Sequence, residues 1–386
     1  MQKEQRQAVD GAVEQYRALL ERQLDRAEAL EHQPPALDHA KLDRVVIGAC
    51  PGDGIGPIIF REALRVLEHL LAPEIASGRV EIRRIDGLTL ENRLACGKTV
   101  PDDVLEEIKA CHVLLKGPTT TPQAGSGLPN LESANVALRR ELDLFANMRP
   151  ISVPELGIDW AFFRENTEGE YVLGSQGVEI PGALTMDFKV TTLAGTRRIA
   201  RAAFEHAKAC GKTRVSIVTK ANIMKKTDGM FSAVCHQVAE EYPGIAVDEW
   251  YVDIMSANLI NEAVRGQFQV FVLPNLYGDI ITDEAAQIQG GVGTAGSANI
   301  GDRYAMFEAI HGSAPRMIQE GLGEYANPAS ILKAGEMLLR HIGRTAAADR
   351  LSEAMAALDR EGTVQVTGAR EGATCRAYAD ALLALL

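Results

Sequence analysis

The chain has 386 residues, of which 46% are hydrophobic, and it carries a formal net charge of −12 at pH 7. This length fits two domains better than one, and the hydrophobic content is sufficient for a full core. The negative charge argues against nucleic acid and against an anionic membrane surface as partners. A negatively charged substrate would therefore need a local basic pocket.

Cysteine usage and the absence of targeting patterns indicate a cytoplasmic protein. The six cysteines are scattered and show no C-x-x-C spacing, which argues against the common zinc and dithiol motifs. Scattered free thiols are typical of a reducing compartment. No apolar run approaches the length of a membrane span. The N-terminus lacks an apolar signal core, and its acidic residues are not typical of a mitochondrial presequence.

An amphipathic helix is predicted over residues 3–31, ahead of a linker that contains Pro34 and Pro35. Its apolar residues recur at spacings of three and four and form one stripe. They are Val9, Val13, Tyr16, Leu20, Leu24, Ala27 and Leu30. A stripe of this kind needs a surface to cover, which is either the rest of the chain or a second subunit.

The first α/β unit begins at residue 44. A strand over 44–49 leads into a glycine turn at 51–57 and then into a helix over 58–71. The turn reads Pro-Gly-Asp-Gly-Ile-Gly-Pro, which differs from the G-x-G-x-x-G fingerprint of the dinucleotide-binding Rossmann fold. The turn is therefore weak support for a Rossmann fold.

Strands and helices alternate along the rest of the chain, which is typical of an α/β fold. Strands are expected at 80–85, 112–116, 159–163, 215–219, 245–252, 268–273 and 306–310. Helices are expected at 102–110, 130–145, 196–209, 229–242, from 279 onward, and at 327–339, 344–360 and 375–386. Residues 148–150 are expected to close the helix 130–145, residues 172–193 to form an extended excursion or hairpin, and the glycine-rich residues 290–301 to form a loop.

A pair of carboxylates follows the strand over 268–273. Asp279 and Asp283 are four residues apart in a predicted helix, so both lie on one helical face. Hard cations such as Mg²⁺ and Mn²⁺ take oxygen ligands of this type. The alternative is an acidic first turn that suits the helix dipole, and on this pair alone that alternative is favoured.

Basic side chains near predicted turns add further candidate chemistry. Arg139, Arg149 and Arg164 are each able to clamp a carboxylate through two hydrogen bonds. Lys220 ends a strand, where a metal site nearby would favour its neutral form and a role as general base. Each of these residues alone is more often a solvated surface group, and Tyr171 alone is more often a packed ring.

Together the motifs resemble those of the β-decarboxylating dehydrogenases, the family of isocitrate, isopropylmalate, homoisocitrate and tartrate dehydrogenases. The resemblance covers about residues 44–375 and is specific, because many motifs occur in the order that the family shows. They are Pro51-Gly-Asp-Gly-Ile-Gly-Pro57, Lys116-Gly-Pro118, Arg164-Glu-Asn166 with Tyr171, Lys220-Ala-Asn222, Asn275-Leu-Tyr-Gly-Asp279, Gly296-Ser-Ala-Asn-Ile-Gly301 and His311-Gly-Ser-Ala-Pro315.

The resemblance implies a twisted mixed sheet with helices on both faces and no Rossmann motif. It implies a large cofactor-binding domain over 41–144 and 290–386, and a small domain over 145–289 with the dimer interface and an arm near 172–193. An N-terminal helical extension over 1–40 lies outside the resemblance. The family's enzymes are homodimers or larger, and each active site is built from two subunits. Family geometry would bring Lys220 and Asp253 from the partner subunit.

The resemblance also assigns roles in an oxidative decarboxylation. A small anionic 2-hydroxy acid loses hydride to a nicotinamide and then loses CO₂, while Mg²⁺ or Mn²⁺ acts as a Lewis acid. Asp253, Asp279 and Asp283 match the metal ligands. Lys220 matches the base that helps remove the hydroxyl proton, and Tyr171 matches the acid. Residues that match the substrate site are Thr121, Ser133, Asn135, Arg139, Arg149, Arg164 and Asn222.

Substrate choice is expected to depend on Ser133, Asn135 and Arg139. Isocitrate enzymes carry a small hydroxyl residue and an asparagine at these spacings, so the resemblance favours isocitrate, and the alternative for Ser133 is a helix cap. Isopropylmalate, homoisocitrate, tartrate and malate dehydrogenases are alternatives within the family. A non-catalytic regulatory subunit is the alternative from another class, and the intact set of catalytic residues argues against it.

The choice of nucleotide stays open at the level of sequence. Residues that match the cofactor site are Lys116, Asn299, Ile300, Gly301, Glu308, His311, Gly312, Ala314, Arg316 and Asn327. Arg316 stands where NAD-preferring relatives commonly carry an aspartate, and a basic residue there favours a 2′-phosphate. The tyrosine and arginine that bacterial NADP enzymes carry further on are not evident near Gln365. The balance favours NAD, with NADP as the alternative.

Overall fold

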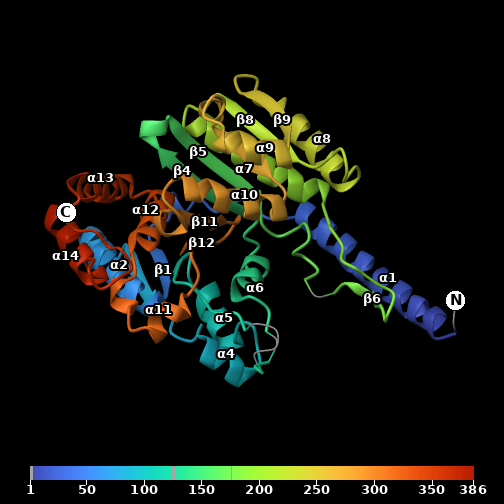
Figure 1. Ribbon diagram of the computed structural model, residues 1–386, viewed down its shortest axis with the longest axis horizontal. Coiled ribbons are helices and arrows are strands. Elements are labelled where there is room, and N and C mark those ends of the chain that lie inside the picture. The colour runs from blue at the N-terminus through green and yellow to red at the C-terminus, as the bar shows by residue number, and fades with distance from the viewer. Residues whose placement is uncertain (1–2, 123–126, 130, 175) are drawn as a thin grey trace. The chain divides into compact units, whose positions relative to one another are not determined.

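The computed structural model describes residues 3–122, 127–129, 131–174 and 176–386. The chain divides into two compact units (Figure 1). Unit 1 contains Met1–Pro35 and Ser152–Glu284, and unit 2 contains Ala36–Ile151 and Ala285–Leu386. The N-terminal helix therefore belongs to the same unit as the residues that follow Ile151. Within the described residues, no helix combines the length and the apolar content needed to cross a membrane.

Unit 2 is built on a mixed sheet whose strands lie in the order β2-β1-β3-β12-β11-β4. Their bounds are β1 Val45–Cys50, β2 Val80–Arg84, β3 Val113–Lys116, β4 Ala146–Val153, β11 Gly296–Ile300 and β12 Ala305–Ala309. The neighbours β2, β1, β3 and β12 pair in parallel, whereas β11 is antiparallel to both β12 and β4. The sheet is therefore mixed, as the sequence predicted.

Helices cover both faces of this sheet because the side chains of a strand alternate between its faces. The helices are α2 Gly56–Leu70, α3 Ala72–Ala76, α4 Leu90–Cys96, α5 Asp102–Lys109, α6 Ala134–Glu141, α11 Pro315–Gln319, α12 Ala329–His341, α13 Thr345–Glu361 and α14 Cys375–Leu385. Val45 and Ile47 of β1 pack into a core with α2, α12, α13 and α14. The intervening Val46 packs into a second core with α5 and α6.

Unit 1 is built on parallel strands in the order β5-β10-β8-β9. Their bounds are β5 Ile158–Glu165, β8 Arg214–Thr219, β9 Ala246–Tyr251 and β10 Val270–Leu273. The helices are α7 Leu193–Ala209, α8 Thr227–Ala239, α9 Val252–Ile260 and α10 Asn275–Ile288. Phe162 of β5 and Phe271 of β10 are register partners whose rings stack with centroids 4.3 Å apart, so they fix the alignment of the two strands.

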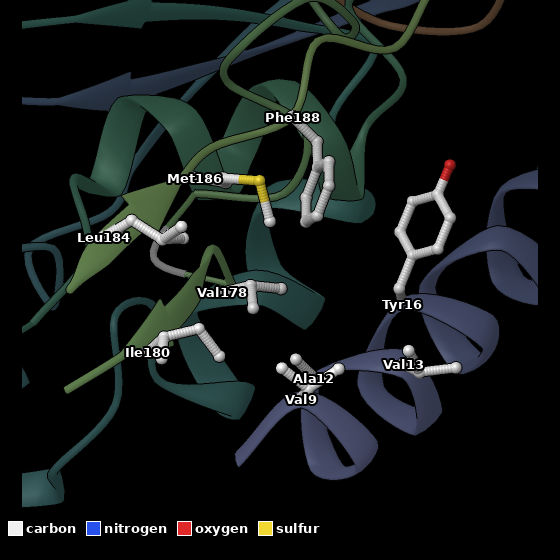
Figure 2. Close-up of a pocket in the computed structure, with 9 residues that line it drawn as sticks. All are labelled: Val9, Ala12, Val13, Tyr16, Val178, Ile180, Leu184, Met186 and Phe188. Atoms are coloured by element: carbon white, nitrogen blue, oxygen red, sulfur yellow. The ribbon is translucent and has the colours of Figure 1, made fainter. Parts of the chain in front are cut away.

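The predicted hairpin within residues 172–193 is confirmed, and α1 lies against it. The arm consists of β6 Val178–Ile180 and β7 Leu184–Met186, which pair in antiparallel fashion. Helix α1, Lys3–Glu31, contributes Val13 and Tyr16 to an apolar pocket shared with the arm (Figure 2). The predicted stripe is only partly covered, because Val13 stays 52% exposed and Leu24 68% exposed. The most buried residue of the helix is Leu19, which is 2% exposed and lies outside the predicted stripe.

Several expected elements were wrong. The glycine-rich stretch 290–301 contains strand β11, because its small residues fit between β12 and β4 rather than forming a loop. Residues 148–150 lie in strand β4, and Pro150 is beyond the residues that pair with β11. The helix expected at 130–145 is reduced to α6, and Asp143 beyond its end has a φ of 46°. Helices α4 and α9 were not expected. Residues 123–126 and 130, on which parts of the loop and helix predictions fall, lie outside the described residues.

A buried histidine pair fixes the segment that enters β1. The Nε2 of His39 lies 3.1 Å from the carbonyl oxygen of Arg303, and the Nδ1 of His39 lies 3.0 Å from the Nε2 of His341. A carbonyl only accepts, so His39 donates through Nε2 and accepts from His341 through Nδ1. Burial, followed by the neighbouring His39, lowers the pKa of His341 to about 4. Both rings are therefore neutral at pH 7.

This pair predicts a loss of stability at acid pH. The ordinary pKa of histidine is 6.5. Between that pH and about 4, His341 is therefore protonated in the unfolded chain but neutral in the folded chain. The pair's contribution to the free energy of unfolding is thus fully present above pH 6.5. Up to about 3 kcal/mol of it is lost as the pH falls through about 4. Urea unfolding of the wild type and of His341→Gln, which still donates but does not titrate, should show a steeper acid loss in the wild type. Parallel pH profiles would contradict the assignment.

Candidate active site

Arg164 lies where the carboxyl ends of two parallel strands meet. In β5 it is the register partner of Leu273, the last residue of β10, and α10 begins two residues later at Asn275. Gly278 in the first turn of α10 permits this approach, because a Cβ at that position would lie 2.6 Å from the Cγ of Arg164. The glycine of the Asn275–Asp279 motif therefore lets α10 pack directly on the arginine.

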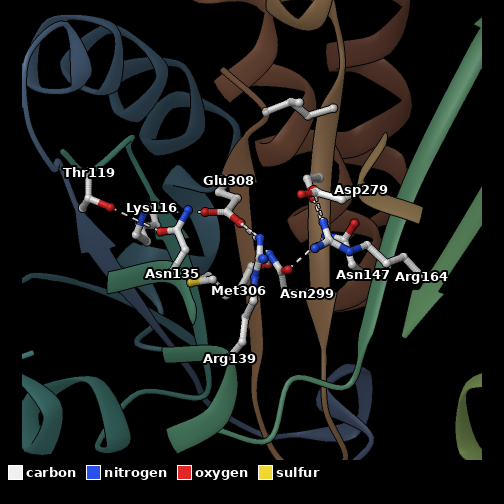
Figure 3. A network of polar contacts seen from close by, with 12 residues as sticks. Lys116, Thr119, Asn135, Arg139, Asn147, Arg164, Asp279, Asn299, Met306 and Glu308 are labelled. Atoms are coloured by element: carbon white, nitrogen blue, oxygen red, sulfur yellow. Dashed lines mark hydrogen bonds and ion pairs between the residues drawn. The ribbon is translucent and has the colours of Figure 1, made fainter. Parts of the chain in front are cut away.

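Asp279 accepts hydrogen bonds from two of the predicted site residues, Arg164 and Tyr171. Figure 3 shows the contact with Arg164. The buried guanidinium of Arg164 forms an ion pair with one carboxylate oxygen of Asp279. The Tyr171 hydroxyl donates to the other oxygen at 2.7 Å. Arg164 also donates from Nε and Nη2 to the side-chain oxygen of Asn275, at 2.9 and 2.7 Å. The structure thus brings together Arg164, Tyr171 and Asp279, which the sequence predicted as site residues.

The carboxylate pair on α10 is not explained by the helix dipole. The helix begins at Asn275 rather than at Asp279, so the expected helix start was wrong and the first turn holds no acidic residue. Asp279 and Asp283 lie in later turns, where the dipole effect has fallen off. The side chain of Asp279 is 38% exposed and Asp283 is exposed. Two accessible carboxylates one turn apart fit a hard divalent cation.

Lys220 and Asp253 form a second pair at the same edge of the unit 1 sheet. They follow β8 and β9, whose last residues, Thr219 and Tyr251, are register partners. The ammonium group of Lys220 donates to Asp253, and this hydrogen bond is the main cause that lowers the pKa of Asp253. The backbone N–H of Lys220 is held at 2.8 Å by Asp228.

A single chain does not assemble the three predicted metal ligands. Among the described residues, no group of three His, Cys, Asp or Glu side chains lies close enough to hold a metal ion. Asp279 and Asp283 share a helix, whereas Asp253 is paired with Lys220. Carboxylates are the donors that Mg²⁺ or Mn²⁺ prefers. Two of the three predicted ligands, Asp279 and Asp283, lie on one helix.

Unit 2 holds a buried polar network whose geometry follows from strand register (Figure 3). Lys116 of β3 and Glu308 of β12 are register partners, and so are Asn147 of β4 and Asn299 of β11. Asn299 donates to Glu308 at 2.9 Å, and Asn147 donates to Asn299 at 2.9 Å. Arg139, from α6, donates to Glu308 at 3.1 Å. The network thus joins predicted cofactor residues to a predicted substrate residue.

The charges in this network are unevenly matched. Burial would raise the pKa of Glu308, but Lys116 and Arg139 together hold it below its ordinary value. Burial lowers the pKa of Lys116 despite Glu308, whose carboxylate is 3.5 Å away. Glu308 is thus ionised between two cations, and its ion pairs with Lys116 and Arg139 give this network one carboxylate for two cations. An anionic ligand would improve the balance.

Of the residues predicted to choose the substrate, Ser133 and Asn135 are partly buried at the start of α6, whereas Arg139 is buried in its last turn. Ser133 occupies the N-cap position but makes no capping hydrogen bond, which removes the structural explanation considered for it. Thr119 donates to the side-chain oxygen of Asn135 at 3.3 Å. Arg93, which the sequence analysis missed, is fully buried and donates to the backbone carbonyls of Thr120 and Glu132 at 2.8 and 3.0 Å. It therefore fixes both ends of the loop before Ser133.

The loop that holds His311, Gly312 and Ala314, three of the predicted nucleotide residues, lies beside the glycine turn. The backbone N–H of Ile55 donates to the carbonyl oxygen of Ser313 at 3.0 Å. Gly54 has a φ of +59°, and a Cβ there would lie 2.0 Å from the same oxygen. The glycines of this turn thus serve close packing of two loops. The buried Nε2 of neighbouring His311 has no hydrogen-bond partner among the described residues, so it fits a polar ligand.

The remaining predicted residues are placed without a shared cluster. Arg316 is 86% exposed and pairs with Glu320 at 2.6 Å. The side-chain oxygen of Asn327 accepts from the backbone N–H of Ala329, the first residue of α12, at 2.9 Å. Thr121, Asn222 and Gly312 are exposed. Arg149 is a buried residue of β4, and Ile300 and Gly301 end and follow β11.

Comparison with known proteins decides the family. The model of the isocitrate/isopropylmalate dehydrogenase family matches residues 46–382. The chain belongs to this family. A crystal structure of isocitrate dehydrogenase from Methylococcus capsulatus is similar, with a TM-score of 0.77 at 34% identity, covering 88% of this chain and 99% of that one. The expected family fold is therefore confirmed, and α1 precedes the matched residues.

Curated members of the family differ in nucleotide and in role. The chain is 37% identical over 310 residues to isocitrate dehydrogenase (NAD) subunit 2 of Schizosaccharomyces pombe, covering 79% of this chain and 77% of the relative. It is 36% identical over 351 residues to isocitrate dehydrogenase (NADP) of Thermus thermophilus, covering 88% and 67%. It is 37% identical over 346 residues to isocitrate dehydrogenase (NAD) regulatory subunit 3 of Arabidopsis thaliana, covering 87% and 88%. Family membership therefore leaves nucleotide and catalytic role to be argued from residues.

The unit 2 network predicts a large cost for removing its anion. Glu308→Gln leaves Lys116 and Arg139 without a counter-charge, and breaking such a buried pair should cost about 3 kcal/mol or more in the free energy of unfolding. The matched control is Glu81→Gln, whose surface pairs with Arg44 and Arg83 should contribute far less to the free energy of unfolding, because water and salt screen exposed ion pairs. Urea unfolding of both variants checks this. Equal costs would show that Glu308 does not compensate the buried cations.

Proposed function

We propose that the chain is a catalytic isocitrate dehydrogenase that converts isocitrate to 2-oxoglutarate and CO₂ with a divalent metal. The observation that carries the proposal is the arrangement on α10. Asp279 holds both the Arg164 guanidinium and the Tyr171 hydroxyl, and Asp283 presents a second carboxylate one turn further on. This combination supplies a cation that would bind a substrate carboxylate, a proton donor and metal ligands in one place.

The residues of the chain have separable tasks in this reaction. When bound, the divalent cation would supply Lewis-acid stabilisation of negative charge on substrate oxygens, and the nicotinamide would accept the hydride. Lys220 takes the proton of the substrate's 2-hydroxyl group while the carbon that bears it loses hydride and becomes a carbonyl. The C–C bond to the β-carboxylate then breaks and CO₂ leaves. Tyr171 gives its hydroxyl proton to the carbon that keeps the electron pair.

The cations assigned to the substrate carboxylates are Arg139, Arg149 and Arg164. Their fork geometry suits bidentate carboxylate binding. Ser133 and Asn135 are assigned to the third carboxylate, which distinguishes isocitrate from substrates with an alkyl group. The uncapped state of Ser133 supports this assignment, because its hydroxyl is not used by α6. Thr121 and Asn222 complete the proposed substrate contacts.

A regulatory subunit is the alternative that the Arabidopsis thaliana relative raises. The chain retains every residue to which proton transfer and metal binding are assigned, and Tyr171 and Lys220 both face carboxylates. These observations favour a catalytic role. The rival substrates are isopropylmalate, homoisocitrate, tartrate and malate, and the assay below separates isopropylmalate, tartrate and malate from isocitrate.

We propose NAD as the nucleotide. Support comes from the stretch near Gln365, where the tyrosine and arginine that bacterial NADP enzymes carry are not evident, while Arg316, the residue that would favour a 2′-phosphate, pairs with Glu320. The proposed cofactor residues all lie in unit 2. They are Lys116, Asn299, Ile300, Gly301, Glu308, His311, Gly312, Ala314, Arg316 and Asn327. We further propose a cytoplasmic location, which the six unpaired cysteines support.

A substrate panel tests the proposed activity. Purified protein with Mg²⁺ and either NAD⁺ or NADP⁺ should oxidise isocitrate with a kcat/KM at least roughly 10²-fold above that for isopropylmalate, tartrate or malate, because unpaired polar groups in the site reject the other acids. Chelation of the metal should abolish turnover. A higher kcat/KM for isopropylmalate would contradict the substrate assignment, and no turnover of any acid would favour a regulatory role.

We also propose a homodimer in which Tyr171 of one chain and Lys220 of the other serve one site. The support is that a single chain does not assemble Asp253 with Asp279 and Asp283 among its described residues. Lys220 is paired with Asp253, so both residues would be contributed together.

Mixing of inactive variants tests the shared site. Lys220→Ala and Tyr171→Ala should each lose roughly 10²–10⁴ in rate. Co-refolding equal amounts makes about half of the dimers mixed, each with one intact site, so activity should return to roughly a quarter of the wild type. Mixing Lys220→Ala with Asp253→Asn is the control and should restore nothing, because both residues come from the same chain. Confirmed subunit exchange without recovery in the first mixture would overturn the model.

A further inference from the structure

We propose that Arg26 of α1 is a positioning residue for the active site, and that it acts on Arg164 and Tyr171 through Glu168. The inference rests on the proposed function for its kinetic consequences and on contacts within unit 1 for its geometry. Helix α1 precedes residues 46–382, which match the family model. It therefore lies outside the matched residues, and its contacts reach the residues around the site.

Helix α1 is fixed along the arm before it reaches the site. Gln15 donates to the carbonyl oxygen of Gly177 at 3.1 Å, and Arg22 donates to the side chain of Gln176 at 2.7 Å. The ring of Tyr16 stacks on Phe188 with centroids 5.1 Å apart (Figure 2 shows both rings). One turn after Arg22, the side chain of Arg26 meets the turn that follows β5.

Arg26 neutralises a carboxylate that is otherwise buried. Its guanidinium donates to Glu168 at 3.0 Å, and the side chain of Glu168 is only 3% exposed. It also donates to the hydroxyl of Thr167 at 3.2 Å. The other donors to the Glu168 carboxylate are the backbone N–H of Thr192, at 2.8 Å, and its hydroxyl. Among these donors to Glu168, Arg26 is thus the one that carries a positive charge.

The need for this cation is increased by a second buried carboxylate. Glu165 accepts from the backbone N–H groups of Thr167 and Glu168 at 3.0 and 2.6 Å. Burial, followed by the charge of Glu168, raises the pKa of Glu165 to about 7. Arg198, which donates to Thr167 at 3.1 Å, is the other cation at this turn. Two acidic groups packed together need compensation for the turn to keep its shape.

The turn is connected to the proposed catalytic groups by an unbroken series of hydrogen bonds. The backbone carbonyl of Glu168 accepts from the side chain of Asn275 at 2.9 Å. The side-chain oxygen of Asn275 accepts from Arg164, which pairs with Asp279, the acceptor of the Tyr171 hydroxyl. Gly169, with a φ of +72°, lies so close that a Cβ would be 2.9 Å from the Cβ of Asn275. A shift of the turn would therefore move Arg164.

Three variants separate positioning from simple packing. Arg26→Gln removes the charge that Glu168 needs, and Arg26→Lys restores a charge. Arg22→Gln is the matched control, because Arg22 lies one turn away on the same helix and donates to the exposed side-chain amide of Gln176. Arg26→Gln should raise KM for isocitrate and lower kcat/KM by roughly tenfold, the loss expected for one charge-assisted hydrogen bond. Arg26→Lys should recover most of this loss, and Arg22→Gln should match the wild type.

A readout that does not need turnover keeps the proposal distinct from the proposed function. Hydrogen–deuterium exchange of peptides that span 164–171 should speed up in Arg26→Gln but not in Arg22→Gln. If the wild type does not oxidise isocitrate, the proposed function fails, and the exchange data alone still decide the positioning role. Unchanged exchange and kinetics in Arg26→Gln would overturn the inference. A lower Tm with wild-type KM and kcat would also overturn it, because that is the result of packing alone.

Discussion

The site depends on one electrostatic constraint, which is that buried cations need anions. Arg164 is almost completely buried, and Asp279 and Asn275 supply its acceptors. Because α10 starts directly after β10, the chain can place both acceptors beside Arg164, the second-last residue of β5. The same aspartate holds the Tyr171 hydroxyl. One carboxylate therefore fixes both Arg164, the cation proposed to bind the substrate, and Tyr171, the proposed acid.

The same constraint recurs in each unit. In unit 2 the buried Arg139 is held by the buried Glu308, and in unit 1 the more exposed Lys220 is paired with Asp253 in the same way. Under the proposed function, a substrate carboxylate competes with these internal anions for the same cations. A divalent cation on Asp253 and Asp279 would occupy the carboxylates and so leave Lys220 and Arg164 for the substrate. Metal and substrate are then expected to support each other's binding, by the reciprocity of linked equilibria.

The sequence predicted the parts of this arrangement that depend on local pattern. Apolar runs identified β5, β8, β9 and β10, and parallel strands bring their carboxyl ends to one edge. The roles expected of Arg164, Lys220, Asp253 and Asp279 came from the family resemblance of the motifs that contain them. The glycines of 290–301 and Pro150 concealed β11 and β4, because strand pairing there depends on distant partners. Arg26 and Glu168 are 142 positions apart, and no local pattern in the sequence marks their contact. The buried Arg93 was missed for the same reason, since its acceptors are backbone carbonyls.

The central claim is that the carboxylate face of α10 binds a divalent metal, and direct titration tests it. Mn²⁺ binding should be measured by calorimetry on the wild type and on Asp283→Asn, with circular dichroism to confirm that the fold is kept. The account predicts that the variant folds normally, because it loses only one of two repelling charges. Its affinity for Mn²⁺ should fall by more than about tenfold, the loss already typical of an outer-shell change. An unchanged affinity in a folded variant would contradict the account.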